Sequence, residues 1–441
     1  MNFLQQLRNN AQKAITRWMH IDLTKRSERN GYYLIVEIFF STFLTAAASF
    51  NAAYAIRLGA GDEHISFMTS IPALIAVLIS IPAGQILQKT SRKKSLLVRA
   101  LALHRAGFIV ILLAPLLDNF NVNRGAVVTW VLILFMLPAQ FFNIGFTSIT
   151  ATVIRPEQRG AVFSLRNQIF FAVSSVMSFL FGIWLDAVIF PLNYQIMYAA
   201  SFMVSMIGLF YLNRLEITER TKKEKAKKKI SIPVIQQVKN LFVDFHNNPQ
   251  FMRFNINTFL MDFGLWAVVP IFTVYYVNEL GAGESWLGLL ATFGSLTNIF
   301  GFGLWRKIVN RLGRKKVLLF TSLIRPVYPI VVALFPNLTV IIILNAVLGL
   351  VMPGLGLSHY SMMLDATPND RRDQFTAYYT MFQNISVFLA PLVGAAVLQW
   401  AGYRTTFIIF GVVRLFGGLM WRINPVIDNS ENVQTADSEK N

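Results

Sequence analysis

Long apolar stretches alternate with short polar segments along almost the whole chain. Twelve of these stretches reach the roughly 20 mostly apolar residues that an α-helix needs to cross the hydrocarbon core of a bilayer. The expected spans are 31–56, 65–87, 95–116, 127–153, 161–186, 194–213, 254–278, 286–305, 317–336, 339–364, 374–400 and 404–421. The pattern therefore predicts an all-α integral membrane protein with twelve transmembrane helices.

Composition supports a membrane protein. Hydrophobic residues make up 54% of the chain and charged residues only 14%, whereas an ordinary soluble domain is roughly 25% charged. The chain contains no cysteine, which excludes disulfides, thiol catalysis and cysteine-ligated metal centres. No other metal or cofactor site is expected from the sequence.

The net charge of +18 would by itself suggest a nucleic-acid partner, but the positions of the basic residues indicate otherwise. If both termini are cytoplasmic, 32 of the 40 Lys and Arg residues lie in cytoplasmic segments, and only Arg57, Arg124 and Arg404 lie in outer loops. This asymmetry follows the positive-inside rule. We therefore expect a multi-pass protein of the inner or plasma membrane, whose basic segments face anionic lipid, and no nucleic-acid partner.

The longest polar segment divides the spans into two groups of six. The expected organisation is a cytoplasmic or interfacial segment (1–30), a six-helix bundle (31–213), a basic cytoplasmic linker (214–253), a second six-helix bundle (254–424) and a polar cytoplasmic tail (425–441). Apolar residues recur at helical spacing near the start of the chain, which predicts an interfacial amphipathic helix there.

The two groups of six repeat in sequence. Leu-Gly-Ala-Gly follows the first span at 58–61 and the seventh span at 280–283, an offset of 222 residues. At the same offset, Arg-Lys-Lys recurs at 92–94 and 314–316. Two parallel six-span repeats are typical of one large class of transporters.

The loops that follow spans two and eight carry a motif. The first reads Gly-Gln-Ile-Leu-Gln-Lys-Thr-Ser-Arg-Lys at 84–93, and the second reads Arg-Lys-Ile-Val-Asn-Arg-Leu-Gly-Arg-Lys at 306–315. Both resemble the signature G-x-x-x-D-[RK]-x-G-[RK]-[RK] of the major facilitator superfamily. The resemblance implies a cytoplasmic gate formed by Gly84, Gln88, Lys89, Arg92, Lys93, Asn310, Arg311, Gly313 and Arg314, with Asp365 expected to pair with Arg311.

The motifs depart from the family pattern at the acidic position. Gln88 and Asn310 stand where the family has an acid, and an amide loses a charge–dipole attraction of about 0.3–1 kcal/mol. The gate is therefore expected to be looser or to be latched elsewhere. The markers of proton-linked drug antiporters in spans four and five and the sugar-porter signature are absent, so the subfamily stays open.

The resemblance implies that spans 1, 4, 7 and 10 line a central cavity, and these four spans carry polar residues at helical spacing. In hydrocarbon such a stripe must face protein or water. The candidate cavity residues are Ser41, Thr45, Asn51, Gln140, Asn143, Thr147, Asn255, Trp266 and Asn345. The alternative for each is a hydrogen bond between packed helices.

Three ionisable residues in these spans are candidates for proton handling: Asp262, Glu37 and His359. Burial in hydrocarbon disfavours the ionised form of a carboxyl group, as a proton-coupling site requires. The alternative is a fixed ion pair, for example between Glu37 and Arg166. Arg105 and Arg325 occupy nearly equivalent positions in the two halves, and pairing, snorkelling and anion binding are all open for them.

These patterns predict a secondary active transporter that moves a small molecule by alternating access, proton-coupled and an exporter of amphipathic compounds, and monomeric as the family resemblance implies. The alternatives are a facilitative uniporter and a membrane sensor that keeps the fold without transport. No phosphate-binding G-x-x-x-x-G-K-[ST] and no zinc-binding H-E-x-x-H occurs, so neither ATP-driven pumping nor metalloprotease chemistry is indicated.

Overall fold

The computed structural model describes residues 23–426 except 91, 217–242 and 369–370. The predicted interfacial helix near the start of the chain, most of the linker and most of the tail lie outside the described residues. The first group of helices comprises α2 (Arg26–Ala48), α3 (Asn51–Arg57), α4 (Asp62–Lys89), α5 (Lys93–Leu112), the 3₁₀ helix η1 (Ala114–Phe120), α6 (Arg124–Val153), α7 (Pro156–Ala187) and α8 (Leu192–Asn213).

The second group comprises α11 (Pro249–Trp266), α12 (Val269–Val274), the π-helix η2 (Tyr275–Glu279), α13 (Glu284–Leu312), α14 (Arg314–Ile324), α15 (Val327–Leu334), α16 (Leu338–Asp365) and α17 (Arg372–Ile423). Eleven helices in the described part of the chain are long and apolar enough to cross a membrane. The prediction of an all-α membrane protein is thus confirmed.

The difference between eleven helices and twelve predicted spans arises at α17. A straight helix of 52 residues would be about 78 Å long at 1.5 Å per residue, far more than a hydrocarbon core of about 30 Å. The chain turns at Gly402, whose φ of 72° is non-helical. The turn separates the two segments predicted as the last two spans.

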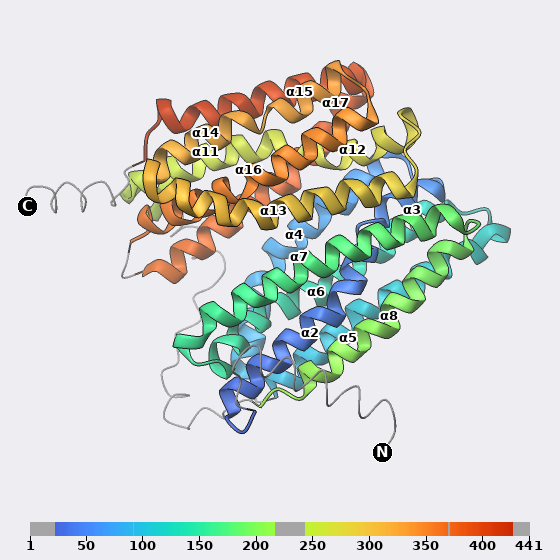
Figure 1. The fold of residues 1–441 in the computed structure, drawn as a ribbon, viewed down its shortest axis with the longest axis horizontal. Helices are drawn as coiled ribbons and strands as arrows, with labels where there is room; N and C mark the ends of the chain where they lie inside the picture. Colours follow the sequence, from blue (N-terminus) through green and yellow to red (C-terminus); the bar gives the residue numbers. More distant parts are fainter. Residues whose placement is uncertain (1–22, 91, 217–242, 369–370, 427–441) are drawn as a thin grey trace, which may run out of the picture.

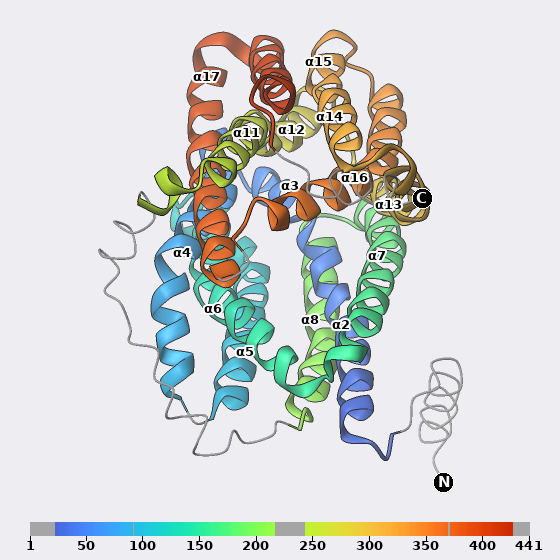
Figure 2. The ribbon, with the colours of Figure 1, turned by 90° about the vertical axis from the view of Figure 1, so that its left-hand side faces the viewer.

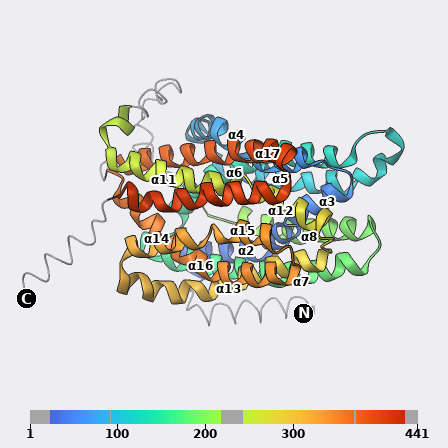
Figure 3. The same ribbon diagram turned by 90° about the horizontal axis from the view of Figure 1, so that it is seen from above.

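The two groups of helices lie side by side and run roughly along one common direction (Figures 1 and 3). We call the end at which α2 and α11 begin the inner end, following the charge pattern, and the opposite end the outer end. In Figure 1 the groups meet near α3 and α12 at the outer end and diverge toward the inner end. Contacts between the groups are formed by α7 with α13 and by α4 with α17, and the second pair is visible in Figure 2.

Glycines allow the close approach of α7 and α13. A Cβ at Gly288 would lie 2.5 Å from the carbonyl oxygen of Ser178, and a Cβ at Gly182 would lie 2.8 Å from that of Glu284. Small residues of this kind let membrane helices pack backbone to backbone. The interface between the halves therefore depends on the absence of these two side chains.

The sequence repeat is also a structural repeat. Gly59 and Gly281 both have positive φ, 91° and 62°, and the glycines two residues later both have extended backbone before α4 and α13. The fourth long helix of each half, α6 and α16, begins with an asparagine whose side chain accepts hydrogen bonds from the first turn. Such caps satisfy amide groups that a helix end leaves without partners.

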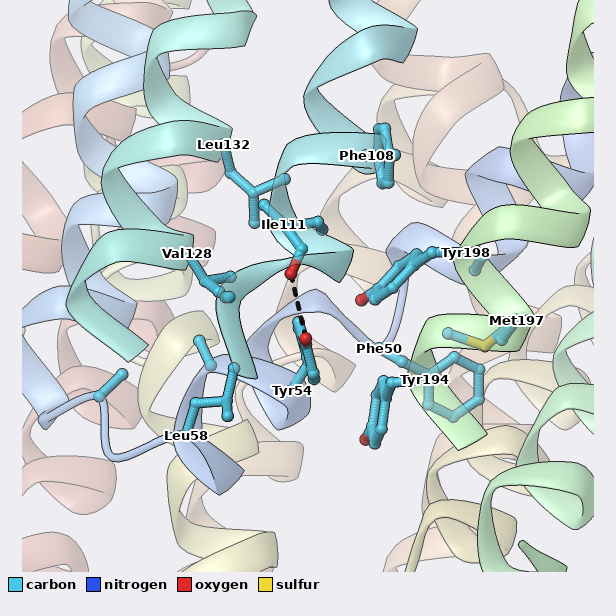
Figure 4. Packing of buried hydrophobic residues seen from close by; sticks show 14 of the residues in the cluster. Phe50, Tyr54, Leu58, Phe108, Ile111, Val128, Leu132, Tyr194, Met197 and Tyr198 are labelled. Atoms are coloured by element: carbon cyan, nitrogen blue, oxygen red, sulfur yellow. Dashed lines mark hydrogen bonds between the residues drawn. The ribbon is translucent and has the colours of Figure 1, made fainter. Parts of the chain in front are cut away.

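Each half has an aromatic core near the outer end. In the first half, Phe50 and Tyr54 are almost completely buried among side chains from α5, α6 and α8, and the Tyr54 hydroxyl donates to the carbonyl of Ile111 at 3.0 Å (Figure 4). At the offset of 222, Phe272 and Tyr276 occupy the same places in the second core. The outer ends of the helices are thus firmly packed in both halves.

Candidate functional site

Glu37, in α2, is buried in a charged cluster within the first half. Its side chain lies 2.9 Å from Nη1 of Arg166 in α7 and 3.8 Å from Nη2 of Arg105 in α5. The Ser41 hydroxyl donates to the same carboxylate at 2.6 Å. The structure therefore pairs Glu37 with Arg166, the ion pair given above as the alternative to proton handling.

The two arginines of this cluster are also bonded to neutral groups. Arg105 donates to the hydroxyl of Ser41 at 2.6 Å and to the carbonyl of Ser205, and Arg166 donates to the carbonyl of Leu34. Both guanidinium groups are buried. Pairing, and not snorkelling to the membrane surface, accounts for Arg105.

Asp262, in α11, has different surroundings. It is half-buried and interacts electrostatically with Arg325, between α14 and α15, and with Arg414 in α17. No hydrogen bond or ion pair joins Asp262 to any residue that the structure describes. Its carboxylate is therefore not fixed as that of Glu37 is.

His359, in α16, faces α11, the helix that carries Asp262. Its Nε2 lies 2.9 Å from the Thr258 hydroxyl, which itself donates to the carbonyl of Phe254. The imidazole packs against the rings of Phe254 and Trp421 at centroid distances of 4.8 and 5.8 Å. His359 and Asp262 both interact with Arg325, so these residues form one polar region of the second half.

A polar latch joins the two halves at the outer end. Arg57, at the end of α3, donates to both carboxylate oxygens of Glu284, at the start of α13, over 2.9 and 3.0 Å. The Tyr194 hydroxyl donates to the same carboxylate at 3.0 Å. Glu284 is only 6% exposed, so the carboxylate of this bidentate ion pair has little contact with solvent.

Asp186, at the end of α7, extends the latch. Its two carboxylate oxygens accept from the backbone N–H groups of Glu284 and Ser285 at 2.9 and 2.8 Å. An acid at a helix N-terminus is favoured by both the unsatisfied N–H groups and the helix dipole. Further along the same helix pair, the hydroxyl of Thr292 donates to the carbonyl of Ser175 at 2.9 Å.

In the repeat, two other charged residues occupy the positions that correspond to Arg57 and Glu284. At the offset of 222, Arg57 corresponds to Glu279 and Glu284 corresponds to Asp62. Asp62 and Glu279 come from different halves and interact electrostatically. The position that holds an ion pair on one side thus holds two acids on the other.

At the inner end, the structure places the second motif around the break between α13 and α14. Asp365 Oδ2 lies 2.9 Å from Nη2 of Arg314, not beside Arg311 as expected. Gly313, with φ of 81°, ends α13 and starts α14, which turns Arg314 toward α16. Asn310 and Arg311 are exposed.

The first motif is only partly described. Gly84, Gln88 and Lys89 lie in the last turns of α4, and their side chains lie outside the described part of the chain. Arg92 is exposed, and Lys93 begins α5. The described polar contacts between the halves gather at the outer end.

The candidate cavity residues fall into two sets. Thr45 and Asn143 are exposed within α2 and α6, and Gln140 and Trp266 are half-buried. Several of the described candidates bond to protein groups: Ser41 to Glu37, Thr45 to the carbonyl of Ser41, Asn51 to Tyr198, Asn255 to the carbonyl of Phe251 and Asn345 to the carbonyl of Leu290. The Thr147 side chain lies outside the described residues. Helix packing is thus the observed role of several of these residues.

Sequence reasoning missed the latch and the partners of Asp262. Arg57, Glu284, Tyr194 and Arg414 are not among the candidate site residues that the sequence suggests. The available signal was the repeat offset, which aligns Arg57 and Glu284 with charged residues of the other half.

Comparison with known proteins gives the family. The sequence profile of the Major Facilitator Superfamily matches residues 35–257 and 254–440. A search of curated protein sequences gave no significant match.

Solved structures share the fold at low identity. A mutant of the nucleoside transporter NupG matches with a TM-score of 0.66 and 12% identity, covering 90% of this chain and 100% of that one. A POT family transporter in complex with 5-aminolevulinic acid matches with 0.66 and 13% identity, over 90% and 96%. A bacterial homologue of the iron transporter ferroportin in an inward-facing state matches with 0.66 and 12% identity, over 88% and 98%. With the twelve-span repeat and the two gate motifs, these findings show that the chain belongs to the major facilitator superfamily of membrane transporters.

Proposed function

We propose that the protein is a secondary active transporter of the inner or plasma membrane, with both termini in the cytoplasm, that moves a small molecule by alternating access. The latch at Glu284 supports this, because the described polar contacts that join the halves gather toward the outer end. The state described here is then the one that opens to the cytoplasm. Transport requires the latch to break while contacts form at the inner end.

Proton coupling is assigned to Asp262. Glu37 is held by two arginines and a serine, so its proton exchange would require breaking a buried network. Asp262 is half-buried and has no such bonds to the described residues. This difference between the two acids is the observation that carries the proposal of proton coupling. The aromatic rings around His359 support an amphipathic substrate, and we propose that this substrate is exported.

The test is a thermal-stability screen of the purified protein in detergent, at low and high pH, against lipophilic cations, organic anions, sugars and amino acids. A ligand at 100 times its Kd adds about 2.7 kcal/mol to stability if it binds only the folded state. We expect one class to raise the melting temperature in a pH-dependent way. Asp262→Asn should abolish the pH dependence.

Asp118→Asn is the matched control, because Asp118 is an exposed acid in η1, remote from the polar region of the second half. It should behave like wild type. If Asp262→Asn keeps the pH dependence of ligand binding, Asp262 does not carry the proton. pH-independent binding with flux would indicate a uniporter, and binding without flux in proteoliposomes would indicate a sensor.

A further inference from the structure

Both halves carry a triad of two arginines and one acid within the helix bundle. In the first half the triad is Glu37, Arg105 and Arg166, and in the second half it is Asp262, Arg325 and Arg414. Each triad has two positive charges and one negative charge. The halves therefore start from the same charge balance, and their hydrogen bonding can be compared directly.

The comparison shows a clear asymmetry. Both guanidinium groups of the first triad donate to carbonyl, hydroxyl or carboxylate oxygens. In the second triad, Nε and Nη2 of Arg414 are buried and have no hydrogen-bond partner among the residues that the structure describes, and Arg414 as a whole is only 3% exposed. The guanidinium group of Arg325 likewise has no hydrogen bond to a residue that the structure describes.

Packing fixes where Arg414 lies. On its own helix it stands between Gly411, which packs against Ile330, and Gly418, which packs against the carbonyl of Ser322. Arg414 thus faces the break between α14 and α15, where Arg325 is located. On its other side, a Cβ on Gly264 of α11 would lie 2.8 Å from the Cβ of Arg414.

A buried guanidinium without partners is costly, because the lost hydration is not replaced. The first triad demonstrates that this fold can satisfy two such groups with its own oxygens. The second triad lacks those oxygens, and like the first triad it carries one excess positive charge. A carboxylate is the group that matches this need, since it balances one charge and can accept two parallel N–H bonds from a guanidinium.

The surroundings of the triad indicate the rest of the ligand. Phe254, Tyr379 and Trp421 gather around His359 at ring distances of 4.8, 6.1 and 5.8 Å. Tyr379 also interacts electrostatically with Asp262. An aromatic body would therefore have rings to pack against beside the charged groups.

We propose that Arg325 and Arg414 form the binding site for the carboxylate of an aromatic organic anion, which is the substrate class of the transporter. This rests on the function proposed above and deepens it. As the substrate carboxylate enters, it takes the place of Asp262 beside the two arginines, and one proton from water binds an Asp262 oxygen. The charge of the site is then the same before and after loading. The charged and titratable groups around Asp262 are Arg325, Arg414, Tyr379 and, beside Arg325, His359.

The experiment measures the melting temperature of the full-length protein in detergent with three probes that share one ring: benzoate, benzamide and benzylamine. Benzoate alone should raise it. Arg414→Met should raise the melting temperature of the ligand-free protein, because a buried charge without partners is replaced by a side chain that packs. The same variant should lose the response to benzoate.

Arg422→Gln is the control, since Arg422 is an exposed arginine on the same helix. It should keep the benzoate response. Arg325→Gln should weaken benzoate binding by about tenfold or more, as expected for the loss of a hydrogen bond to a charged group, and Arg325→Lys should recover part of the affinity. This second position keeps the test decisive if Arg414→Met does not fold.

Four outcomes would overturn the proposal. Equal stabilisation by benzamide would show that charge is not recognised. Stabilisation by chloride in place of gluconate, without a response to benzoate, would show a site for inorganic anions and not for substrate. A ligand-free Arg414→Met protein that melts below wild type and still responds to benzoate would show that Arg414 is structural. Proton-driven flux of a neutral substrate would contradict the anion site and leave the proposed transport function intact. Benzoate binding without flux would contradict the transport function and leave the anion site intact.

Discussion

Glu37→Leu should destabilise the protein by about 3–5 kcal/mol, the usual cost of removing one partner of a buried ion pair. The substitution leaves the guanidinium groups of Arg105 and Arg166 buried without an acid. We expect a large fall in the melting temperature in detergent and a lower midpoint of unfolding in SDS. Because like charges then remain together, the double variant Glu37→Leu with Arg166→Leu should be more stable than the single variant.

Glu216→Gln removes the acid of an exposed ion pair and is the comparison for the buried pair of Glu37. Glu216 also pairs with an arginine, Arg29, at 2.8 Å, and this hydrogen bond lowers the pKa of its carboxyl group. The pair is exposed at the inner end, where water screens it. Its loss should change the melting temperature only slightly. If the Glu37 and Glu216 variants melt alike, the buried cluster does not stabilise the first half.

Glu284→Ala should open the outer end. The variant removes the acceptor of Arg57 and Tyr194. Hydrogen bonds to a charged group contribute about 1.5–3 kcal/mol when buried, and the exposure of Arg57, 43%, argues for the lower part of that range. A loss of about 2 kcal/mol shifts the equilibrium toward the outer-open state roughly thirtyfold.

The absence of cysteine makes this shift easy to measure. A single cysteine at Ala48→Cys, a half-buried position at the outer end of α2, should react faster with a membrane-impermeant maleimide applied from outside when Glu284→Ala is also present. Glu63→Gln, which alters an exposed acid at the same end, should leave the rate unchanged. Equal labelling in all three proteins would mean that the latch does not hold the outer end closed.

Much of the fold could be predicted because the bilayer imposes a length on every span and the repeat sets their orientation. Gly59 and Gly281 carry positive φ at a position that the repeated Leu-Gly-Ala-Gly already marks. The last two spans follow each other without an intervening loop, and only the non-helical backbone of Gly402 separates them. Gaps between helices are visible in a hydropathy pattern, whereas a turn made by one residue is not.

The sites were less predictable because they depend on side chains that are distant in sequence. Arg57 and Glu284 are 227 positions apart, and their contact exists only in one arrangement of the two halves. Asp365 pairs with Arg314 because Gly313 turns the chain there, a rotation that spacing alone does not reveal. Whether an arginine such as Arg414 finds acceptors likewise depends on three helices at once.

The outer rim has consequences for how the molecule would move. Arg57 and Glu284 attract each other on one side, while Asp62 and Glu279 carry like charges on the other. Opening is therefore expected to be a tilt, with the side of Glu284 as the pivot and the acidic side separating first.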